Sequence, residues 1–207
     1  MKKLKIGIIG VGRLGYEHAC NIAARVPGSE LVAIADANFE RARQVAEELG
    51  VPAVYQDPKA LCEDPNVEAV AIITNTASHV EMIKLAMDAG KHVFCEKPLA
   101  DTVEKCKEAE RIIAAHPELI FMLGFMRRYD RGYAEMKRII DSGELGAPLM
   151  IHACHRNVSQ PDGFQTEMGV SNVAIHELDI CRWLLSDEYE SGQVLKGRQS
   201  ACSTKGY

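Results

Sequence analysis

Three glycines at the end of an apolar run limit what the start of this chain can fold into. Gly10, Gly12 and Gly15 have the spacing G-x-G-x-x-G, between a predicted strand at 4–10 and a predicted helix at about 14–26. In such a unit the first glycine makes a tight turn, the second lets a pyrophosphate approach, and the third lets helix and strand pack closely. The motif predicts a dinucleotide site at a helix N-terminus, where backbone N–H groups and the helix dipole favour phosphate.

Short β-branched runs alternate with helical stretches over roughly the first 120 residues, a pattern typical of a parallel sheet covered by helices. The expected strands are 4–10, 30–36, 53–55, 67–74, 92–96 and 119–125. The expected helices are 14–26, 38–50, 57–64, 79–90 and 102–116, with Gly50 and Gly90 as stops. We therefore predict an α/β fold with a Rossmann-type doubly wound parallel sheet in residues 1–122.

The remaining residues, 123–207, are predicted to form part of a second α/β domain. The expected helices are 129–142 and 172–185, and the expected strands are 148–157 and 192–196. Two strands make a marginal sheet, because each edge needs a partner. We therefore expect the chain to end inside a truncated second domain, which would aggregate, fold incompletely or function poorly.

Composition and charge exclude several classes of function. The 207 residues are 47% apolar and 26% charged, as in an ordinary globular protein. A net charge of −5, with scattered Lys and Arg, predicts no binding to nucleic acid or to an anionic membrane. The seven cysteines contain no CxxC pair, so neither a disulfide framework nor a metal site is expected. These features predict a cytoplasmic protein without metal.

Asp36, at the end of the second predicted strand, indicates which dinucleotide is bound. A carboxylate at this place accepts hydrogen bonds from the adenosine ribose hydroxyls, and its charge repels a 2′-phosphate. The sequence therefore predicts NAD. Arg41 and Arg43, on the next predicted helix, are the features that weaken the preference against NADP.

Three groups of polar residues are candidates for chemistry. Lys97 follows the fifth predicted strand at its carboxyl end, where ligands bind in open α/β sheets; the alternative is a solvated loop lysine. His155 and Asn157 are two apart on a predicted strand and so share a face. A further three, Asn172, His176 and Asp179, have the spacing i, i+4, i+7, which is one face of a helix. Alternatively, the two histidines are structural and Asp179 pairs with Arg182.

Several segments in this order resemble the Gfo/Idh/MocA family of nicotinamide-dependent oxidoreductases, and within it the members that oxidise inositol. These segments are GIIGVGRLG, Asp36, TNTASH, CEKPLA, GFMRRYD, GELGAP and IHELDICRWLL. The resemblance covers nearly the whole chain and weakens after about residue 197. It implies a Rossmann domain followed by an α/β domain of the family's C-terminal type, in a homotetramer.

The resemblance also implies roles for particular residues. It implies that the cofactor is bound by Gly10, Gly12, Arg13, Leu14, Gly15, Asp36, Thr74, Asn75, Thr76, His79, Glu96 and Lys97. It implies that a polyol or sugar substrate is contacted by Arg127, His155, Asn157, Asn172 and Asp179. Lys97 and His176 would be catalytic, with His176 as the general base that takes the proton of a secondary hydroxyl, since the imidazole pKa lies near neutral pH.

One departure from the family pattern leaves alternatives open. The family's D-x-x-x-H has an aspartate where this chain has Asn172, which can orient His176 but cannot stabilise an imidazolium by charge. The expected function is NAD-dependent oxidation of a cyclic polyol such as inositol. The alternatives are a sugar dehydrogenase, a reductase for another small ring such as a biliverdin-like or dihydrodiol compound, and a non-catalytic NAD(H)-binding protein.

Overall fold

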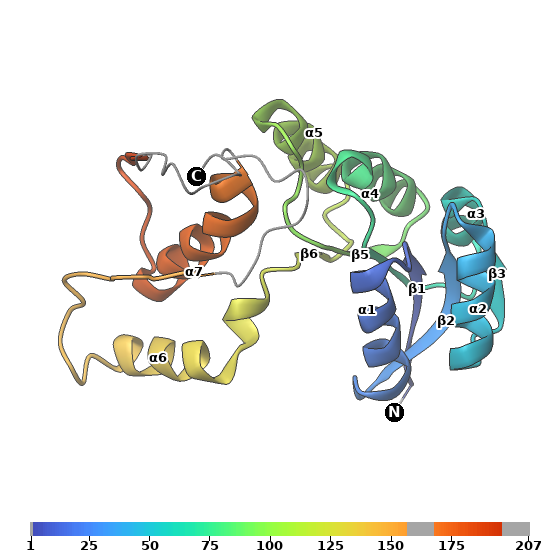
Figure 1. Ribbon diagram of the computed structural model, residues 1–207, viewed down its shortest axis with the longest axis horizontal. Helices are drawn as coiled ribbons and strands as arrows, with labels where there is room; N and C mark the ends of the chain where they lie inside the picture. The colour runs from blue at the N-terminus through green and yellow to red at the C-terminus, as the bar shows by residue number, and fades with distance from the viewer. Residues whose placement is uncertain (1, 157–167, 196–207) are drawn as a thin grey trace, which may run out of the picture. The chain divides into compact units, whose positions relative to one another are not determined.

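The computed structural model describes residues 2–156 and 168–195 (Figure 1). The chain folds into two compact units, unit 1 at residues 1–124 and unit 2 at residues 125–207. No helix in the described part of the chain is long and apolar enough to cross a membrane.

Unit 1 contains a six-stranded parallel sheet in the order β3-β2-β1-β4-β5-β6. The strands are β1 (Leu4–Ile9), β2 (Ser29–Ala35), β3 (Ala53–Tyr55), β4 (Ala69–Ile72), β5 (His92–Cys95) and β6 (Phe121–Leu123). The chain reverses direction across the sheet between β1 and β4, and a cleft is expected at such a point at the carboxyl ends of the strands. The prediction of a Rossmann-type doubly wound sheet is confirmed.

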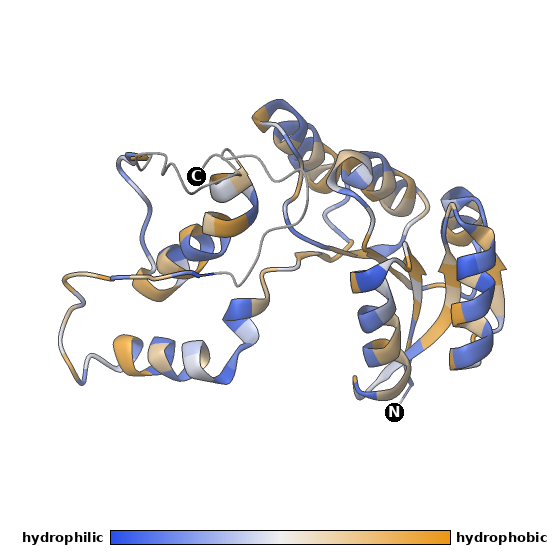
Figure 2. Ribbon diagram, viewed as in Figure 1, coloured by the Kyte–Doolittle hydropathy of each residue, from blue (hydrophilic) through white to orange (hydrophobic). Residues whose placement is uncertain are grey.

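Helices cover both faces of this sheet. They are α1 (Arg13–Ala24), α2 (Phe39–Leu49), α3 (Pro58–Glu63), α4 (His79–Asp88) and α5 (Val103–Ala114). One apolar core lies between the sheet and α1 and α2, and the other lies between the sheet and α3, α4 and α5. Successive residues such as Ile8 and Ile9 enter opposite cores, as the alternation of a strand requires. In Figure 2 the strands are mainly hydrophobic, and hydrophilic residues lie along the helices.

Local signals set where these helices begin and end. Asn38 caps α2, because its side-chain oxygen accepts a hydrogen bond from the Arg41 N–H at 3.2 Å. Thr102 caps α5 in the same way through the Lys105 N–H. Gly50 ends α2 with a φ of 68°, and Gly90 follows α4 with a φ of 72°. The predicted stops at both glycines are confirmed.

Unit 2 is helical over most of its described residues. It contains a 3₁₀ turn, η2 (Met126–Tyr129), then α6 (Arg131–Ser142), a π-helical segment, η3 (Gly169–Ala174), and α7 (Ile175–Leu185). The α6 helix packs against α7. Asp130 caps α6 by accepting hydrogen bonds from the N–H groups of Gly132 and Tyr133.

Two predictions for unit 2 are wrong where the structure describes them. No strand forms at residues 148–156 or 192–195, although both were expected to be strands. An extended segment becomes a strand only by pairing with another, and the described residues of unit 2 contain no such pair.

The helix expected at 172–185 also differs from the helix in the structure. Its α-helical part begins at Ile175, and the turn before it is a π-helix, whose wider i→i+5 spacing breaks the 3.6-residue repeat. His176 and Asp179 are buried, whereas Asn172 is exposed on the π-helical segment. Asn172 therefore lies in the π-helical turn before α7, and His176 and Asp179 lie in α7 itself.

Candidate functional site

The glycine turn after β1 shows a different constraint at each glycine. Gly10 has a φ of 91°, and a Cβ there would lie 2.6 Å from the Ile73 carbonyl oxygen. A Cβ on Gly15 would lie 2.0 Å from the Gly10 carbonyl oxygen, so α1 packs directly on the turn. Among the described residues nothing lies within 4 Å of a Cβ built on Gly12. Gly12 is thus the glycine that leaves space for a ligand at the N-terminus of α1.

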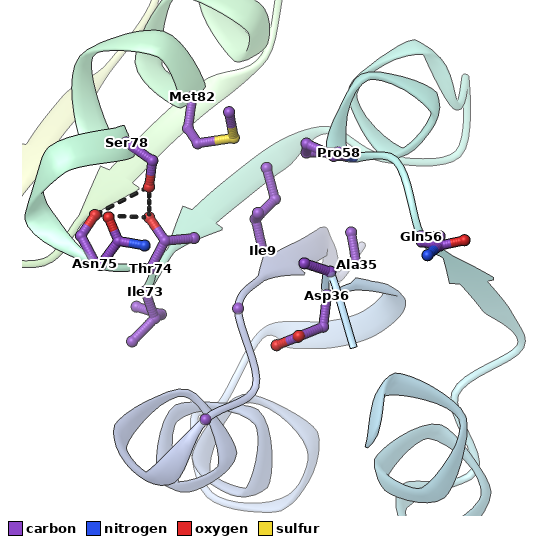
Figure 3. A pocket seen from close by; sticks show the side chains of 13 residues that line it. Ile9, Ala35, Asp36, Gln56, Pro58, Ile73, Thr74, Asn75, Ser78 and Met82 are labelled. Atoms are coloured by element: carbon purple, nitrogen blue, oxygen red, sulfur yellow. Dashed lines mark hydrogen bonds between the residues drawn. The ribbon is translucent and has the colours of Figure 1, made fainter. Parts of the chain in front are cut away.

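That space is part of a cavity of about 410 Å³ at the carboxyl ends of the strands. Figure 3 shows the residues around it, which come from the last residues of β1 and β2, from the loops after β1, β2, β3 and β4, and from α3 and α4. The lining residues are Ile9, Gly10, Gly12, Ala35, Asp36, Ala37, Gln56, Pro58, Ile73, Thr74, Asn75, Ser78 and Met82. Five of the predicted cofactor residues are therefore brought together around one cavity: Gly10, Gly12, Asp36, Thr74 and Asn75.

The carboxylate of Asp36 braces the glycine turn as well as lining the cavity. One of its oxygens accepts a hydrogen bond from the Val11 N–H at 2.8 Å, and the other accepts from the Asn38 N–H at 2.8 Å. A carboxylate has about four acceptor positions, so ribose hydroxyls can still bind to it. The role expected from the sequence fits this geometry, and the contact with Val11 adds a structural role that the sequence did not reveal.

Neither of the two arginines Arg41 and Arg43 of α2 lines the cavity. Arg41 donates from Nε to the Val11 carbonyl oxygen at 3.3 Å, and its guanidinium lies 5.1 Å from the centre of the Tyr16 ring. Arg43 pairs with Glu40 at 3.6 Å on the helix surface. The acidic group at the cavity is thus Asp36, which favours the ribose hydroxyls of NAD over a 2′-phosphate.

The TNTASH segment forms a tight turn beside the cavity. Ser78 Oγ lies 2.8 Å from Thr74 Oγ1 and donates to the Asn75 carbonyl oxygen at 2.9 Å (Figure 3). Thr76 is exposed in the 3₁₀ turn η1 (Thr76–Ser78). Ser78 was not among the predicted site residues, although its position inside this motif was the available signal.

His79 is buried beneath the cavity, whereas the prediction placed it at the cofactor. Only 1% of the residue is exposed, and it does not line the cavity. Its Nδ1 lies 2.8 Å from the Pro98 carbonyl oxygen, and its Nε2 lies 3.3 Å from the Thr74 carbonyl oxygen. The ring therefore connects the loop that follows β4 with the loop that follows β5.

The residues Glu96 and Lys97 follow β5 at this same edge, but they do not line the cavity. Both carboxylate oxygens of Glu96 have protein partners. One lies 3.0 Å from His18 Nε2, and the other accepts a hydrogen bond from the Lys97 N–H at 3.1 Å. The peptide bond between Lys97 and Pro98 is cis. Glu96 was predicted to bind the cofactor, and its partner His18 was not predicted.

Arg13, Leu14 and Gly15, which were also predicted to bind the cofactor, form the first turn of α1. Arg13 and Leu14 are exposed, and Gly15 is buried against the turn. The helix N-terminus therefore presents backbone groups toward a ligand, while Gly15 contributes through packing.

Unit 2 has a separate cavity of about 400 Å³. Arg127, His155 and Glu177 line it and contact one another: Arg127 is ion-paired with Glu177, and His155 Nδ1 lies 3.2 Å from a Glu177 oxygen. The His155 ring centre is 6.3 Å from that of His176, which is buried. Three of the predicted residues, Arg127, His155 and His176, are thus neighbours. Glu177, which was not predicted, contacts two of them. Asn157, predicted beside His155, lies outside the described residues.

Asp179, predicted as a substrate contact or as the partner of Arg182, pairs with Arg128 instead. Arg128 donates from Nε to Asp179 Oδ2 at 2.9 Å and from Nη2 to Oδ1. These hydrogen bonds raise the pKa of Arg128. Arg182 pairs with Glu188. With a side chain only 4% exposed, Asp179 joins α7 to the η2 turn.

No group of three or more potential metal ligands is found among the residues that the structure describes.

Burial raises the pKa of the Cys95 thiol to about 12, so this cysteine beside Glu96 is a protonated core residue at neutral pH.

The three glycines allow a test that separates packing from ligand binding. We expect Gly15→Ala to lower the free energy of unfolding by about 3 kcal/mol, because the added carbon overlaps the Gly10 carbonyl. We expect Gly12→Ala to keep its stability and to lose NADH binding, because its Cβ points into open space where a pyrophosphate would lie. Urea unfolding and a fluorescence titration with NADH measure the two effects; an unchanged NADH affinity in Gly12→Ala would contradict the assignment.

The Glu177 cluster predicts how unit 2 responds to acid. Burial acts to raise the pKa of Glu177, but the hydrogen bonds from Arg127 and His155 outweigh it and hold the pKa below its usual value. A lowered pKa in the folded state means that the pairing stabilises above the unfolded-state pKa of about 4.3 and is lost as the pH falls through the folded-state pKa.

We therefore expect Glu177→Gln to lose less stability than the native chain between about pH 6 and pH 3. The fluorescence of Trp183, the single tryptophan, reports on α7 during urea unfolding. Glu135→Gln is the matched control, because Glu135 pairs with Arg138 on the exposed surface, where an ion pair contributes little. Equal acid sensitivity of Glu177→Gln and the native chain would contradict the prediction.

Comparisons with known proteins identify the family of the chain. Residues 4–125 match the model of the Gfo/Idh/MocA oxidoreductase family with an NAD-binding Rossmann fold, and residues 133–201 match the model of its C-terminal domain. Inositol 2-dehydrogenase of Pseudomonas fluorescens (strain SBW25) is 43% identical over 199 residues, covering 96% of this chain and 59% of the relative. The corresponding enzyme of Azotobacter vinelandii is 41% identical over the same length.

A solved structure is similar over almost the whole chain. Myo-inositol dehydrogenase from Lactobacillus casei, in complex with NAD(H) and myo-inositol, has a TM-score of 0.92 and 35% identity, covering 98% of this chain and 60% of that one. The chain spans 59% of the length of the first curated relatives that it matches. Since family models match both units, the chain belongs to the Gfo/Idh/MocA family of oxidoreductases, and unit 1 is its NAD-binding Rossmann domain.

Proposed function

We propose that this protein transfers a hydride between NAD and a secondary hydroxyl of a cyclic polyol such as inositol. The observation that carries the proposal is the unit 1 cavity, in which Gly12 leaves open space at a helix N-terminus and Asp36 supplies a carboxylate. The polyol part rests on relatives named inositol 2-dehydrogenase and on the similar structure that holds NAD(H) and myo-inositol.

The residues of the unit 1 cavity fit a dinucleotide. The pyrophosphate would lie against Gly12 and the N–H groups of α1, and Asp36 would accept hydrogen bonds from the ribose hydroxyls. When bound, NAD supplies the hydride acceptor. Thr74 and Asn75, at the end of β4, would hold the cofactor from the other side of the cavity.

The protein's own part in the reaction is to bind the polyol and to take its proton. We assign the proton to a ring nitrogen of His176, acting as general base on the hydroxyl whose carbon loses the hydride. Lys97 would donate a hydrogen bond to a substrate hydroxyl. Arg127 and His155, which line the unit 2 cavity, would contact further hydroxyls and so orient the ring.

Two finer assignments belong to the same proposal. We propose a cytoplasmic location, which rests on the six described cysteines being free. We propose a homotetramer, which rests on the family resemblance alone.

Turnover by the purified chain tests this function directly. NADH formation is followed by its near-ultraviolet absorbance with NAD and a panel of inositols and aldoses. We expect turnover with an inositol, and we expect His176→Ala to abolish it because no other group takes the proton. Faster turnover with an aldose would identify a sugar dehydrogenase, and NADH binding without any turnover would identify a non-catalytic NAD(H)-binding protein.

Asn172 gives a second test, because it replaces the family's aspartate with a neutral amide. A carboxylate near His176 would favour the protonated imidazole that forms as the hydroxyl loses its proton. We expect Asn172→Asp to raise kcat by at least about threefold and to move the acid limb of the pH–rate profile upward. Asn172→Gln, which keeps the amide, is the control. A kcat within about threefold of the native value would remove support for a charge effect at this position.

A further inference from the structure

The backbone of Lys97 is held by a carboxylate that is itself held by a residue of α1. Glu96 accepts the Lys97 N–H on one oxygen at 3.1 Å, and its other oxygen lies 3.0 Å from His18 Nε2. The side chain of Glu96 is 14% exposed and that of His18 is 26% exposed. This carboxylate therefore connects α1 with the backbone of the Lys97 segment.

Gly124 and Phe94 lie close to this carboxylate. A Cβ built on Gly124 would lie 3.2 Å from the carboxyl carbon of Glu96 and 3.1 Å from the Phe94 ring, so a side chain at 124 would press on both. The His18 ring packs at 5.5 Å, centre to centre, against the same Phe94 ring. The pair therefore lies between an aromatic ring and a glycine whose missing side chain makes room for it.

A second histidine holds the other side of the lysine. The Pro98 carbonyl oxygen, one residue after Lys97, lies 2.8 Å from Nδ1 of the buried His79. Lys97 thus lies between an N–H bound to Glu96 and a neighbouring carbonyl bound to His79. A segment restrained on both sides directs its side chain more narrowly than a solvated loop does.

We infer that His18 and Glu96 are positioning residues that hold Lys97 in place for a polyol hydroxyl. The inference rests on the proposed function for the role of Lys97, while the contacts themselves do not depend on it. His18 lies on the helix whose first turn follows Gly12, so one helix serves both the glycine turn and the lysine segment. A lysine displaced by about 1 Å would cost up to roughly a hundredfold in rate.

Amide hydrogen exchange of the intact chain, followed residue by residue by NMR, tests the link without requiring turnover. We expect the Lys97 N–H to exchange at least about tenfold faster in Glu96→Met, which removes the acceptor, and also in His18→Leu, which frees the carboxylate to turn. We expect His18→Gln and Glu96→Gln, which keep polar groups in place, to recover most of the protection.

Glu68 and His116 provide matched controls in the same unit. Glu68, which precedes β4, accepts the Lys5 N–H at 3.0 Å and pairs with Lys2. Like Glu96, it is a carboxylate that binds one backbone N–H and one basic side chain. Glu68→Met should speed exchange of the Lys5 N–H and leave that of Lys97 unchanged. His116 has Nδ1 at 2.9 Å from the Ile112 carbonyl oxygen, and His116→Leu should also leave Lys97 unchanged.

Kinetics then separate positioning from a general loss of stability. We expect His18→Leu and Glu96→Met to lower kcat by about tenfold to a hundredfold, and we expect His18→Leu, which changes no predicted cofactor residue, to keep KM for NAD within about twofold. Unchanged exchange of the Lys97 N–H in both variants would overturn the inference. Faster Lys97 exchange in a chain whose native form oxidises no polyol would uphold the link and reject the proposed function instead.

Discussion

The close approach of Gly15 to the Gly10 carbonyl is the constraint on which the rest of unit 1 depends. A methyl group at Gly15 would lie 2.0 Å from that oxygen, so α1 packs against the turn too closely for any residue with a side chain at position 15. This approach places the N-terminus of α1 at the cavity and brings His18, one turn later, to Glu96. Widening it would move the phosphate site and the lysine segment together.

Carboxylates in both units are held by basic partners that are distant in sequence. Glu96 and His18 are 78 residues apart, Asp179 and Arg128 are 51 apart, and the interval between Glu177 and Arg127 is 50. The members of two pairs, Arg127 with Glu177 and Arg128 with Asp179, lie in segments that the sequence singled out, whereas His18 does not, and no spacing pattern predicted which residues would pair. A removed partner would leave a partly buried charge uncompensated, which costs more than the pair contributes.

The parts of the fold that could be predicted are those that local patterns encode. The strands of unit 1 follow apolar runs, and helices end at Gly50 and Gly90, where a positive φ is required. Of the five cavity residues, Gly10, Gly12 and Asp36 could be predicted from the glycine motif and the strand that follows it, and Thr74 and Asn75 from the family resemblance. The strand expected at 148–157 has no pairing partner in the described residues. Whether a segment forms a strand depends on a second segment that pairs with it, and the sequence pattern of the first segment carries no information about that partner.

Residue type and position in a motif do not distinguish a ligand contact from an internal support. His79 and Asn75 belong to the same motif, yet Asn75 lines the cavity while His79 is 1% exposed and binds two carbonyl oxygens of the protein. His79 is the first residue of α4 and is buried, whereas Asn75 lies before that helix at the cavity. A motif in this fold therefore contains both the groups that touch a ligand and the groups that hold them there, and only burial and hydrogen-bond partners tell them apart.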